Sequence, residues 1–253
     1  MTAEILFFGD VHGHFQHVID VVREHTPAAI VLLGDIQAKK PLERELEWIL
    51  DETEVWFIHG NHDTDSGADY DHLFGSQLAD RNLDGRVVDI AGVRIAGLGG
   101  LFRGQVWRPP EDPNCRSAAD FARTRGAGNR WRDGLVLKHR SSIFPDVYDQ
   151  LAALHADVLV THEAPAVHPH GFDALDELAR QMRVSTTFHG HHHDNLDYSK
   201  HWDQLRHKAY GVGFCGITAL DGTVIRVGDY DTVRKTRGDY GLPFKIVGDD
   251  HKI

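Results

Sequence analysis

Residues 4–14 read EILFFGDVHGH, a short apolar run followed at once by a glycine, an aspartate and two histidines. The apolar half predicts a buried strand, and the spacing of apolar residues over 15–25 predicts a helix after it. Two more apolar runs, residues 28–33 and 54–59, predict strands, with a helix over about 41–51 that opens at a proline. Strands that alternate with helices indicate crossover connections and therefore a parallel sheet.

The second half of the chain predicts a mixed pattern of strands. Residues 86–90 and 93–97 flank Ala91-Gly92 and predict a hairpin. Residues 100–142 are rich in glycine, proline, arginine and asparagine and predict a long excursion. We expect one domain over residues 1–253, with this arginine-rich excursion at about 100–142. The remaining expected elements are a helix near 146–155, a strand at 157–161, a helix at 173–183, a strand at 185–189 and a hairpin at Asp221-Gly222.

Composition excludes several classes of protein. The 253 residues carry a net charge of −11, and an acidic chain is a poor general binder of nucleic acid or of an anionic membrane. No apolar run approaches the roughly 18 residues of a membrane span, and the first residues do not resemble a secretory signal. Two cysteines, Cys115 and Cys215, are too few for a disulfide framework, so a reducing cytoplasm is expected. A single disulfide bond between them stays an alternative. Residues 101–140 carry eight arginines and Lys138 against four acids, which suits a small anionic substrate.

Polar clusters follow five of the predicted strands, at the point where each strand ends. In open α/β sheets, ligands bind beside the carboxyl ends of the strands, so these clusters are expected to meet at one rim. The clusters are Gly9-Asp10-Val11-His12-Gly13-His14, Gly34-Asp35-Ile36, Gly60-Asn61-His62-Asp63, His162-Glu163 and Gly190-His191-His192-His193.

The spacing and chemistry of these clusters are typical of metal ligands. Residues two apart, as in Asp10-x-His12, point the same way in an extended or tightly turning segment, so both can face one cation. By the same rule His192, between two histidines, is expected to point away. Carboxylate, imidazole and amide donors without thiolates suit first-row divalent metals. Two such ions that share a carboxylate clamp the attacking and leaving oxygens of a displacement at phosphorus.

The ordered series of clusters, from residue 9 to residue 193, resembles the calcineurin-like metallophosphoesterases. The resemblance implies an α/β fold, a four-layer α/β/β/α sandwich of two mixed sheets flanked by helices. It also implies two divalent transition-metal ions, Mn²⁺ or Fe first, with Zn²⁺, Ni²⁺ or Co²⁺ as alternatives. Residue by residue, it places Asp10, His12, Asp35 and His193 on one metal, and Asp35, Asn61, His162 and His191 on the other.

The resemblance further implies the acid of the reaction. His62 would be the imidazole that holds no metal and protonates the leaving oxygen, and Asp63 would accept its other N–H. The protein-phosphatase branch has an Asp-Arg-Gly soon after Gly-Asp, whose arginine grips phosphate, but residues 34–40 here read GDIQAKK. Arg103 and Arg108 are candidates to replace that arginine.

Seven further histidines are expected, taken singly, to be surface or core residues. His14 is the exception, because it shares a loop with two proposed ligands and is a candidate substrate contact. The other six are His17, His59, His168, His170, His189 and His192.

The sequence therefore predicts a dinuclear phosphoesterase that hydrolyses a small phosphorylated substrate by attack of a metal-activated water. A phosphodiester or nucleotide-like substrate is favoured over a phosphomonoester, a phosphoprotein or a dinucleotide polyphosphate. A non-catalytic scaffold of the same fold is a remote alternative, because every ligand position and His62 are filled.

Overall fold

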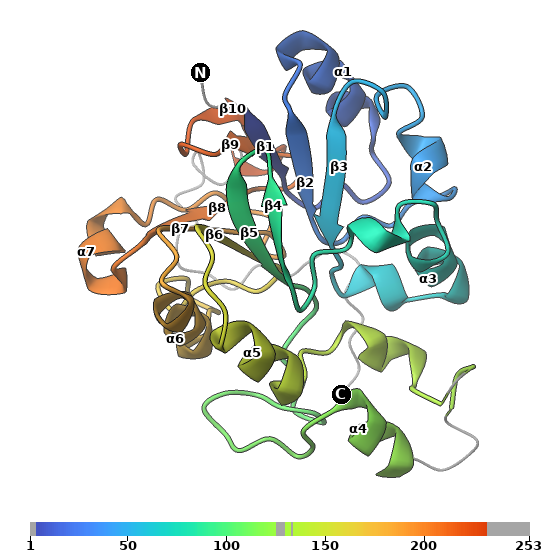
Figure 1. Cartoon of the computed structure of the whole chain (residues 1–253), viewed down its shortest axis with the longest axis vertical. Coiled ribbons are helices and arrows are strands. Elements are labelled where there is room, and N and C mark those ends of the chain that lie inside the picture. Colours follow the sequence, from blue (N-terminus) through green and yellow to red (C-terminus); the bar gives the residue numbers. More distant parts are fainter. Residues whose placement is uncertain (1–3, 125–129, 133, 232–253) are drawn as a thin grey trace.

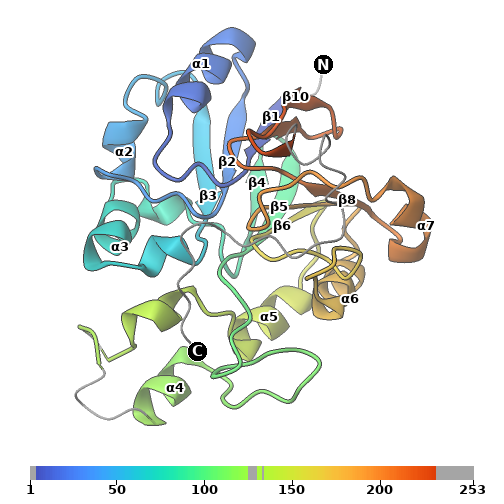
Figure 2. The same ribbon diagram turned by 180° about the vertical axis from the view of Figure 1, so that it is seen from behind.

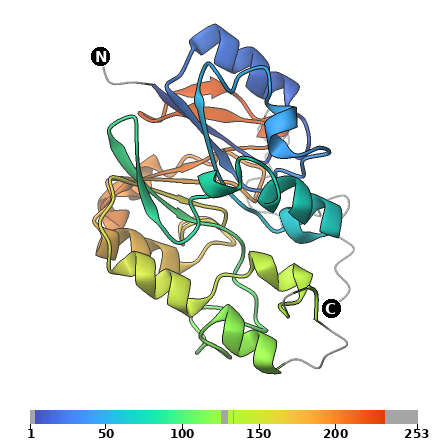
Figure 3. The same cartoon turned by 45° about the vertical axis from the view of Figure 1, so that its right-hand side comes forward.

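A computed structural model describes residues 4–124, 130–132 and 134–231 of the chain. Two five-stranded sheets face each other, and helices cover their outer faces (Figures 1 and 3). The first sheet has the order β10 (Val224–Arg226), β9 (Ile217–Ala219), β1 (Ile5–Phe8), β2 (Ala29–Leu33) and β3 (Glu54–Ile58). The second has the order β4 (Val87–Ile90), β5 (Val93–Leu98), β6 (Val158–Thr161), β7 (Thr186–His189) and β8 (Lys208–Gly211). Both sheets are mixed, which confirms the expected α/β/β/α layering.

Alternate residues of each central strand pack into different layers. In β1, Leu6 and Phe8 join the core under the first set of helices, whereas Phe7 faces the other sheet. The Phe7 ring stacks on Phe188 of β7 with centroids 3.9 Å apart, so the two sheets share one apolar core. Strands buried on both faces explain why the sequence shows continuous apolar runs instead of alternation.

The helices present one apolar face to a sheet. Helix α1 (Gln16–His25) buries Val18, Ile19 and Val22 against the first sheet, with α2 (Leu42–Glu45) and α3 (Gly67–Phe74) on the same side (Figure 3). Helices α5 (Pro145–Ala152) and α6 (Asp173–Met182) cover the second sheet. The shorter helices are η1 (His62–Thr64), η2 (Ala79–Arg81), α4 (Ala118–Thr124), η4 (Leu137–Ser141), η5 (Ser199–His201) and α7 (Trp202–Leu205).

One predicted helix is shorter than expected. The helix over 41–51 ends at Glu45, and the N–H of Ile49 bonds to the carbonyl of Leu46, 3.0 Å away and three residues back. These tight turns keep Leu46 and Ile49 buried, while Trp48 is 63% exposed. The hairpin at Ala91-Gly92 is confirmed, with φ values of 51° and 84° that suit a two-residue turn.

The described residues of the excursion, 100–124, 130–132 and 134–142, lie beside the ends of both sheets and include α4 and η4 (Figures 1 and 2). Its Val106 and Phe121 form a small apolar cluster with Phe144, which lies just after the excursion, and with Val147 of α5. Within the described ranges, the structure shows no helix with the length and apolar character that crossing a bilayer requires.

Candidate metal centre

The predicted ligands meet beside the carboxyl ends of strands from both sheets. Donor atoms of four residues form a first group, and donor atoms of three form a second, all within 4.8 Å of one another in each group. Asp35, which follows β2, belongs to both groups, as a bridging carboxylate must. The first group is Asp10, His12, Asp35 and His193, and the second is Asp35, His162 and His191.

Asn61 completes the second group. Its Oδ1 lies 3.3 Å from Nε2 of His162, and the same Nε2 lies 3.3 Å from Oδ2 of Asp35. The amide oxygen therefore points at the space that the second group encloses. All seven residues expected as ligands are brought together in the two predicted sets.

The imidazoles are oriented so that their Nε2 atoms face inward. Nδ1–H of His12 donates to Oε1 of Gln37 over 2.6 Å, and Nδ1–H of His162 donates to the carbonyl of Leu33 over 2.8 Å. These bonds leave both Nε2 atoms to face the centre, where the neutral ring offers its lone pair to a metal. Nε2 of His12 lies 3.1 Å from Nε2 of His193. Two nitrogens that bind one tetrahedral zinc at about 2.0–2.1 Å stand ~3.3 Å apart, so the residues fit a metal ion.

The two carboxylates are buried and held by backbone N–H groups. The N–H of His191 donates to Asp10, 2.9 Å from its Oδ2, and the N–H of His62 donates to Oδ1 of Asp35 over 2.8 Å. Burial raises the pKa of Asp10 to about 8. Burial opposes a charge on His162, but the Asp35 carboxylate raises the pKa of His162 to about 10. Without a metal, the imidazolium of His162 thus neutralises the Asp35 carboxylate. A bound metal cation would supply that positive charge in its place.

The backbone at the ligands is strained. Asp10, His12, Asp35, His191 and His193 all have positive φ, from 32° to 70°. Such values are uncommon in residues with a side chain and cost of order 1–3 kcal/mol each, so they persist only where the surroundings enforce them.

Two glycines allow the ligand loops to approach closely. A Cβ on Gly60 would lie 2.2 Å from Oδ1 of Asp35. A Cβ on Gly34, whose φ is +94°, would lie 2.4 Å from Nδ1 of His162. The Gly-Asp and Gly-Asn pairs of the sequence are therefore requirements of packing around the centre.

His62 lies beside the centre, but its partner differs from the expected one. Among the described residues, none of the candidate ligand groups includes His62. Its Nδ1 is 2.6 Å from Oδ2 of Asp65, so Asp65 takes the role expected of Asp63. Asp63 points inward and accepts the N–H groups of Ile36, Gln37 and Gly60, each over 2.8 Å. The 3₁₀ turn η1 places residue i+3, not i+1, on the same face as His62.

The two candidate arginines have different surroundings. Arg103 is largely buried, and its Nη2 donates to Oγ of Ser141 over 3.1 Å. Oγ of Ser141 also lies 2.6 Å from Oγ1 of Thr64 in η1, the turn that carries His62, which brings the guanidinium near the centre. Arg108 is exposed and lies over the Phe172 ring, 5.5 Å from its centroid.

Most other described arginines of the excursion have structural partners. Arg132 binds both carboxylate oxygens of Asp71 in α3, at 2.6 and 2.7 Å. Arg140 donates to the hydroxyl of Tyr70 over 3.0 Å. Arg116 pairs with Asp149, and Arg123 pairs with Asp120. The positive charge of this segment thus mainly fastens it to the body of the protein.

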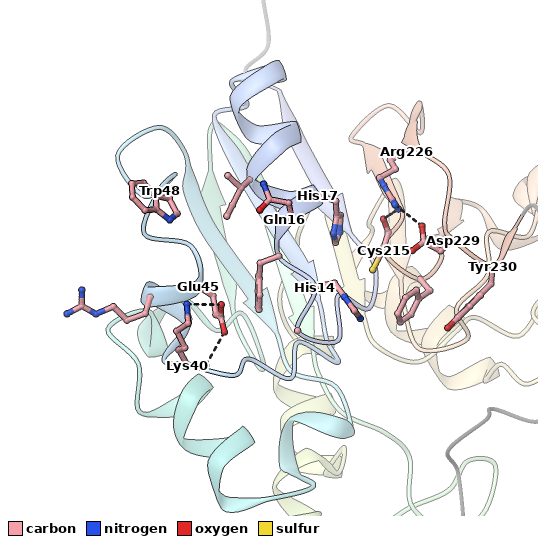
Figure 4. A pocket seen from close by; sticks show the side chains of 15 residues that line it. His14, Gln16, His17, Lys40, Glu45, Trp48, Cys215, Arg226, Asp229 and Tyr230 are labelled. Carbon is pink, nitrogen blue, oxygen red and sulfur yellow. Dashed lines mark hydrogen bonds and ion pairs between the residues drawn. The ribbon is translucent and has the colours of Figure 1, made fainter.

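A hollow of about 700 Å³ opens beside the first metal group (Figure 4). His14 is exposed on its rim, and its ring lies 6.1 Å from that of Phe214. Phe214 in turn lies 5.4 Å from His12 and 5.2 Å from His193, and it stacks on Tyr230 at 4.8 Å. The lining residues labelled in Figure 4 are His14, Gln16, His17, Lys40, Glu45, Trp48, Cys215, Arg226, Asp229 and Tyr230.

Sequence reasoning missed three residues of the centre. Gln37 orients His12, Asp65 holds His62, and Phe214 covers the two histidines of the first group. Only Asp65 carried a signal, because an acid three residues after His62 shares its face in a tight turn.

Comparisons with known proteins agree with this geometry. Residues 3–195 match the model of the family described as calcineurin-like phosphoesterase. The chain is 41% identical over 221 residues to an uncharacterized protein of Haemophilus influenzae, which covers 87% of this chain and 96% of that protein. The crystal structure of TT1561 of Thermus thermophilus has a similar fold, with a TM-score of 0.55 at 13% identity over 90% of this chain and 99% of that one. The chain belongs to the calcineurin-like phosphoesterase family and is a hydrolase that acts on phosphate esters.

Proposed function

We propose that this protein is a dinuclear phosphodiesterase that cleaves a small, nucleotide-like diester. The observation that carries the proposal is the hollow beside the first metal group. Phe214 and Tyr230 line this hollow and stack on each other, and the ring of Phe214 also contacts the candidate ligand His12. A diester has a second organic arm on its phosphorus, and that arm needs a surface next to the centre. Stacked aromatic rings offer such a surface to a nucleobase.

The two ligand groups would hold the ion pair, with Asp35 as the shared carboxylate. When bound, two divalent ions would activate a water and offset the charge of the phosphate. His62 lies with its ring 5.4 Å from that of His12, in a position to protonate the leaving oxygen. Asp65 accepts the Nδ1–H of His62, which leaves Nε2 to face the substrate. Arg103 would pair with a phosphate oxygen.

A neutral imidazole in the hollow supports an organic arm over a further phosphate. Burial lowers the pKa of His17 to about 4, so this side chain is uncharged near neutrality. Its Nε2 is buried and has no hydrogen-bond partner within the described part of the chain. The cations of the hollow are engaged, since Lys40 pairs with Glu45 and Arg226 with Asp229. An uncharged side chain in the wall of the hollow suits an organic arm better than it suits an anion.

Arg103 favours a second candidate, a phosphomonoesterase. A buried guanidinium beside the centre is suited to the extra charge of a monoester. The two candidate activities differ in their use of the hollow. A diester would place its second organic arm there, whereas a monoester with a small leaving group would leave the hollow empty.

Turnover of matched substrates tests the proposal. With Mn²⁺ added, we expect bis-p-nitrophenyl phosphate and nucleotide diesters to be cleaved faster than p-nitrophenyl phosphate. Tyr230→Leu should lower kcat/KM for nucleotide diesters by roughly 5- to 150-fold, the range that the loss of about 1–3 kcal/mol of base stacking gives. The small aryl diester serves as the control. Faster cleavage of the monoester, or an equal loss on both diesters, would contradict the diesterase assignment.

Metal content tests the dinuclear centre separately. Elemental analysis of the metal-replete chain should find two transition-metal ions. Asp35→Asn should weaken both positions, because Asp35 belongs to both ligand groups, whereas Asn61→Ala should empty only the second. A wild-type chain that holds one ion at most would rule the ion pair out.

A further inference from the structure

His192 lies between two ligands of the centre, and its ring packs into a second cluster of imidazoles. It stacks on His168 with centroids 3.9 Å apart and planes 19° from parallel. His191 lies 4.7 Å away on one side, and His170 lies 5.9 Å away on the other. His170 is exposed, whereas His168 is buried. The cluster therefore runs from the surface to the metal centre.

The inner end of this cluster contains a third group of donor atoms. Glu163, His191 and His192 each offer one ligand atom, and these atoms lie within 4.8 Å of one another. Glu163 is buried directly after the ligand His162, and its Oε1 accepts the N–H of Phe102 over 3.1 Å. His191 also belongs to the second metal group. The third group thus shares a ligand with the centre without being part of it.

The other imidazoles of the cluster are supports and not ligands. Nδ1 of His168 accepts the N–H of His170 over 3.0 Å, and its Nε2 lies 3.4 Å from Oδ2 of Asp194. Both ring nitrogens of His168 are therefore engaged, and its face is what contacts His192. His189 is engaged in the same way, by the carbonyl of Gly190 at 3.0 Å and the hydroxyl of Tyr198 at 3.1 Å. These contacts fix the ring of His192 beside His191.

We propose that Glu163, His191 and His192 form an outer cation position, from which a transition-metal ion passes to the second position of the centre. The proposal rests on the dinuclear centre proposed above. The inner ligands Asp35 and His162 are almost completely buried, so an ion must shed its water before it reaches them. Stripping a divalent cation of water is costly unless protein donors replace the water step by step. His191, which both groups share, provides the transfer.

The outer position should be weaker than the inner pair. The charges of Arg103 and Arg108 act on Glu163, and they also repel a cation held there. A weak position that exchanges its ion quickly suits transfer, whereas a tight one would trap the ion. The outer group is therefore expected to govern how fast the centre fills and not how many ions it retains.

Metal uptake by the full-length, metal-free chain tests the proposal. Zn²⁺ is mixed with the protein in the presence of a chromophoric zinc indicator, and the time course of uptake is recorded. His192→Phe keeps a ring against His168 but removes the donor nitrogen, and Glu163→Gln keeps an acceptor for Phe102. Each should slow the phase that fills the second position by about tenfold or more, the scale of effects around metal sites. Both variants should still retain two ions after desalting.

The controls separate the outer position from the centre and from general folding. His170→Phe is the same substitution outside the donor group, and it should take up Zn²⁺ within twofold of the wild-type rate. Asn61→Ala identifies the phase, because it should abolish filling of the second position. If His192→Phe does not fold, as circular dichroism tells, Glu163→Gln carries the test alone.

Two results would overturn the proposal while leaving the ion pair intact. One is an unchanged uptake rate in the folded variants, and the other is loss of a tightly held ion from either, which would make the residue an inner ligand. A wild-type chain that retains fewer than two ions would overturn the dinuclear centre and this proposal together.

Discussion

Replacing Arg103 by alanine should weaken substrate binding more than it slows the chemical step. The guanidinium is largely buried between Ser141 and the acidic residues of the centre, and burial lowers its pKa, although it stays charged near neutrality. Its Nε is buried and finds no hydrogen-bond partner in the described part of the chain. We expect the guanidinium to pair with a phosphate oxygen through its other N–H groups.

The size of the effect follows from the kind of contact. A hydrogen bond to a charged group contributes about 1.5–3 kcal/mol, so kcat/KM should fall roughly 10- to 150-fold in Arg103→Ala. The change should appear mainly in KM, because the contact exists with substrate and transition state alike. Metal content should not change, since Arg103 is not a candidate ligand.

Steady-state kinetics on the best substrate, with three matched variants, provide the assay. Arg103→Lys keeps the charge but not the planar fork and should recover part of the loss. Ser141→Ala removes the partner of Nη2 and should stay within about threefold of wild type, well below the cost of losing the charged contact itself. Arg108→Ala should have the smaller effect of the two arginine truncations, because Arg108 is exposed over Phe172. An Arg103→Ala enzyme within twofold of wild type in kcat/KM would refute the reasoning.

Three further expectations follow from the centre and its surroundings. Asp65→Asn should lower kcat by about 10- to 100-fold, because Asp65 holds the ring of His62, which we propose as the acid. The loss should be greater for alkyl than for p-nitrophenyl esters, and equal losses on both would contradict the proposed role. Metal binding to the metal-free centre at pH 7 should release about two protons per chain, because the pKa values of His162 and Asp10 are about 10 and about 8. Calorimetry in buffers of different ionisation enthalpy counts these protons. A count of zero would contradict the pairing of a protonated His162 with Asp35. Burial lowers the pKa of His189 to about 4 from an ordinary value near 6.5, so His189 takes up a proton when the protein unfolds between these pH values. The free energy of unfolding should therefore fall as the pH is lowered from 6.5 to 4, by up to about 3 kcal/mol. Denaturant titrations of metal-free protein at pH 7 and 4.5 should show this loss, and His189→Gln should reduce it; an unchanged pH dependence would assign the loss to other groups.

That the candidate ligands lie together was predictable, because each of them follows a strand. Parallel strands bring their carboxyl ends to one edge, so Asp10 after β1 and Asp35 after β2 must lie close together. His162 after β6 and His191 after β7 follow by the same rule in the second sheet. Residues spaced two apart in a turn then share a face, which accounts for His12 and His193.

The partners of the ligands were not predictable, because they depend on tight turns and on distant segments. Adjacent in sequence to His62, Asp63 points into the protein to satisfy three backbone N–H groups. His192 belongs to neither ligand group of the pair, but no sequence pattern indicates that His168 stacks on it. Arginine-rich composition likewise does not reveal that Arg132 binds Asp71, 61 residues away.

The candidate ligands lie at the ends of strands, whereas the residues proposed to contact the substrate lie in loops. At these strand ends, Asp10 and Asp35 have strained backbone conformations and accept backbone hydrogen bonds. A site that the fold has already arranged loses little freedom when it binds metal. Phe214 and Arg103 instead belong to the loop after β8 and to the excursion, segments with weak sequence pattern that contact the centre from outside. Loops on a rigid scaffold change more freely than the scaffold does, so relatives with the same ligands can act on different phosphate esters.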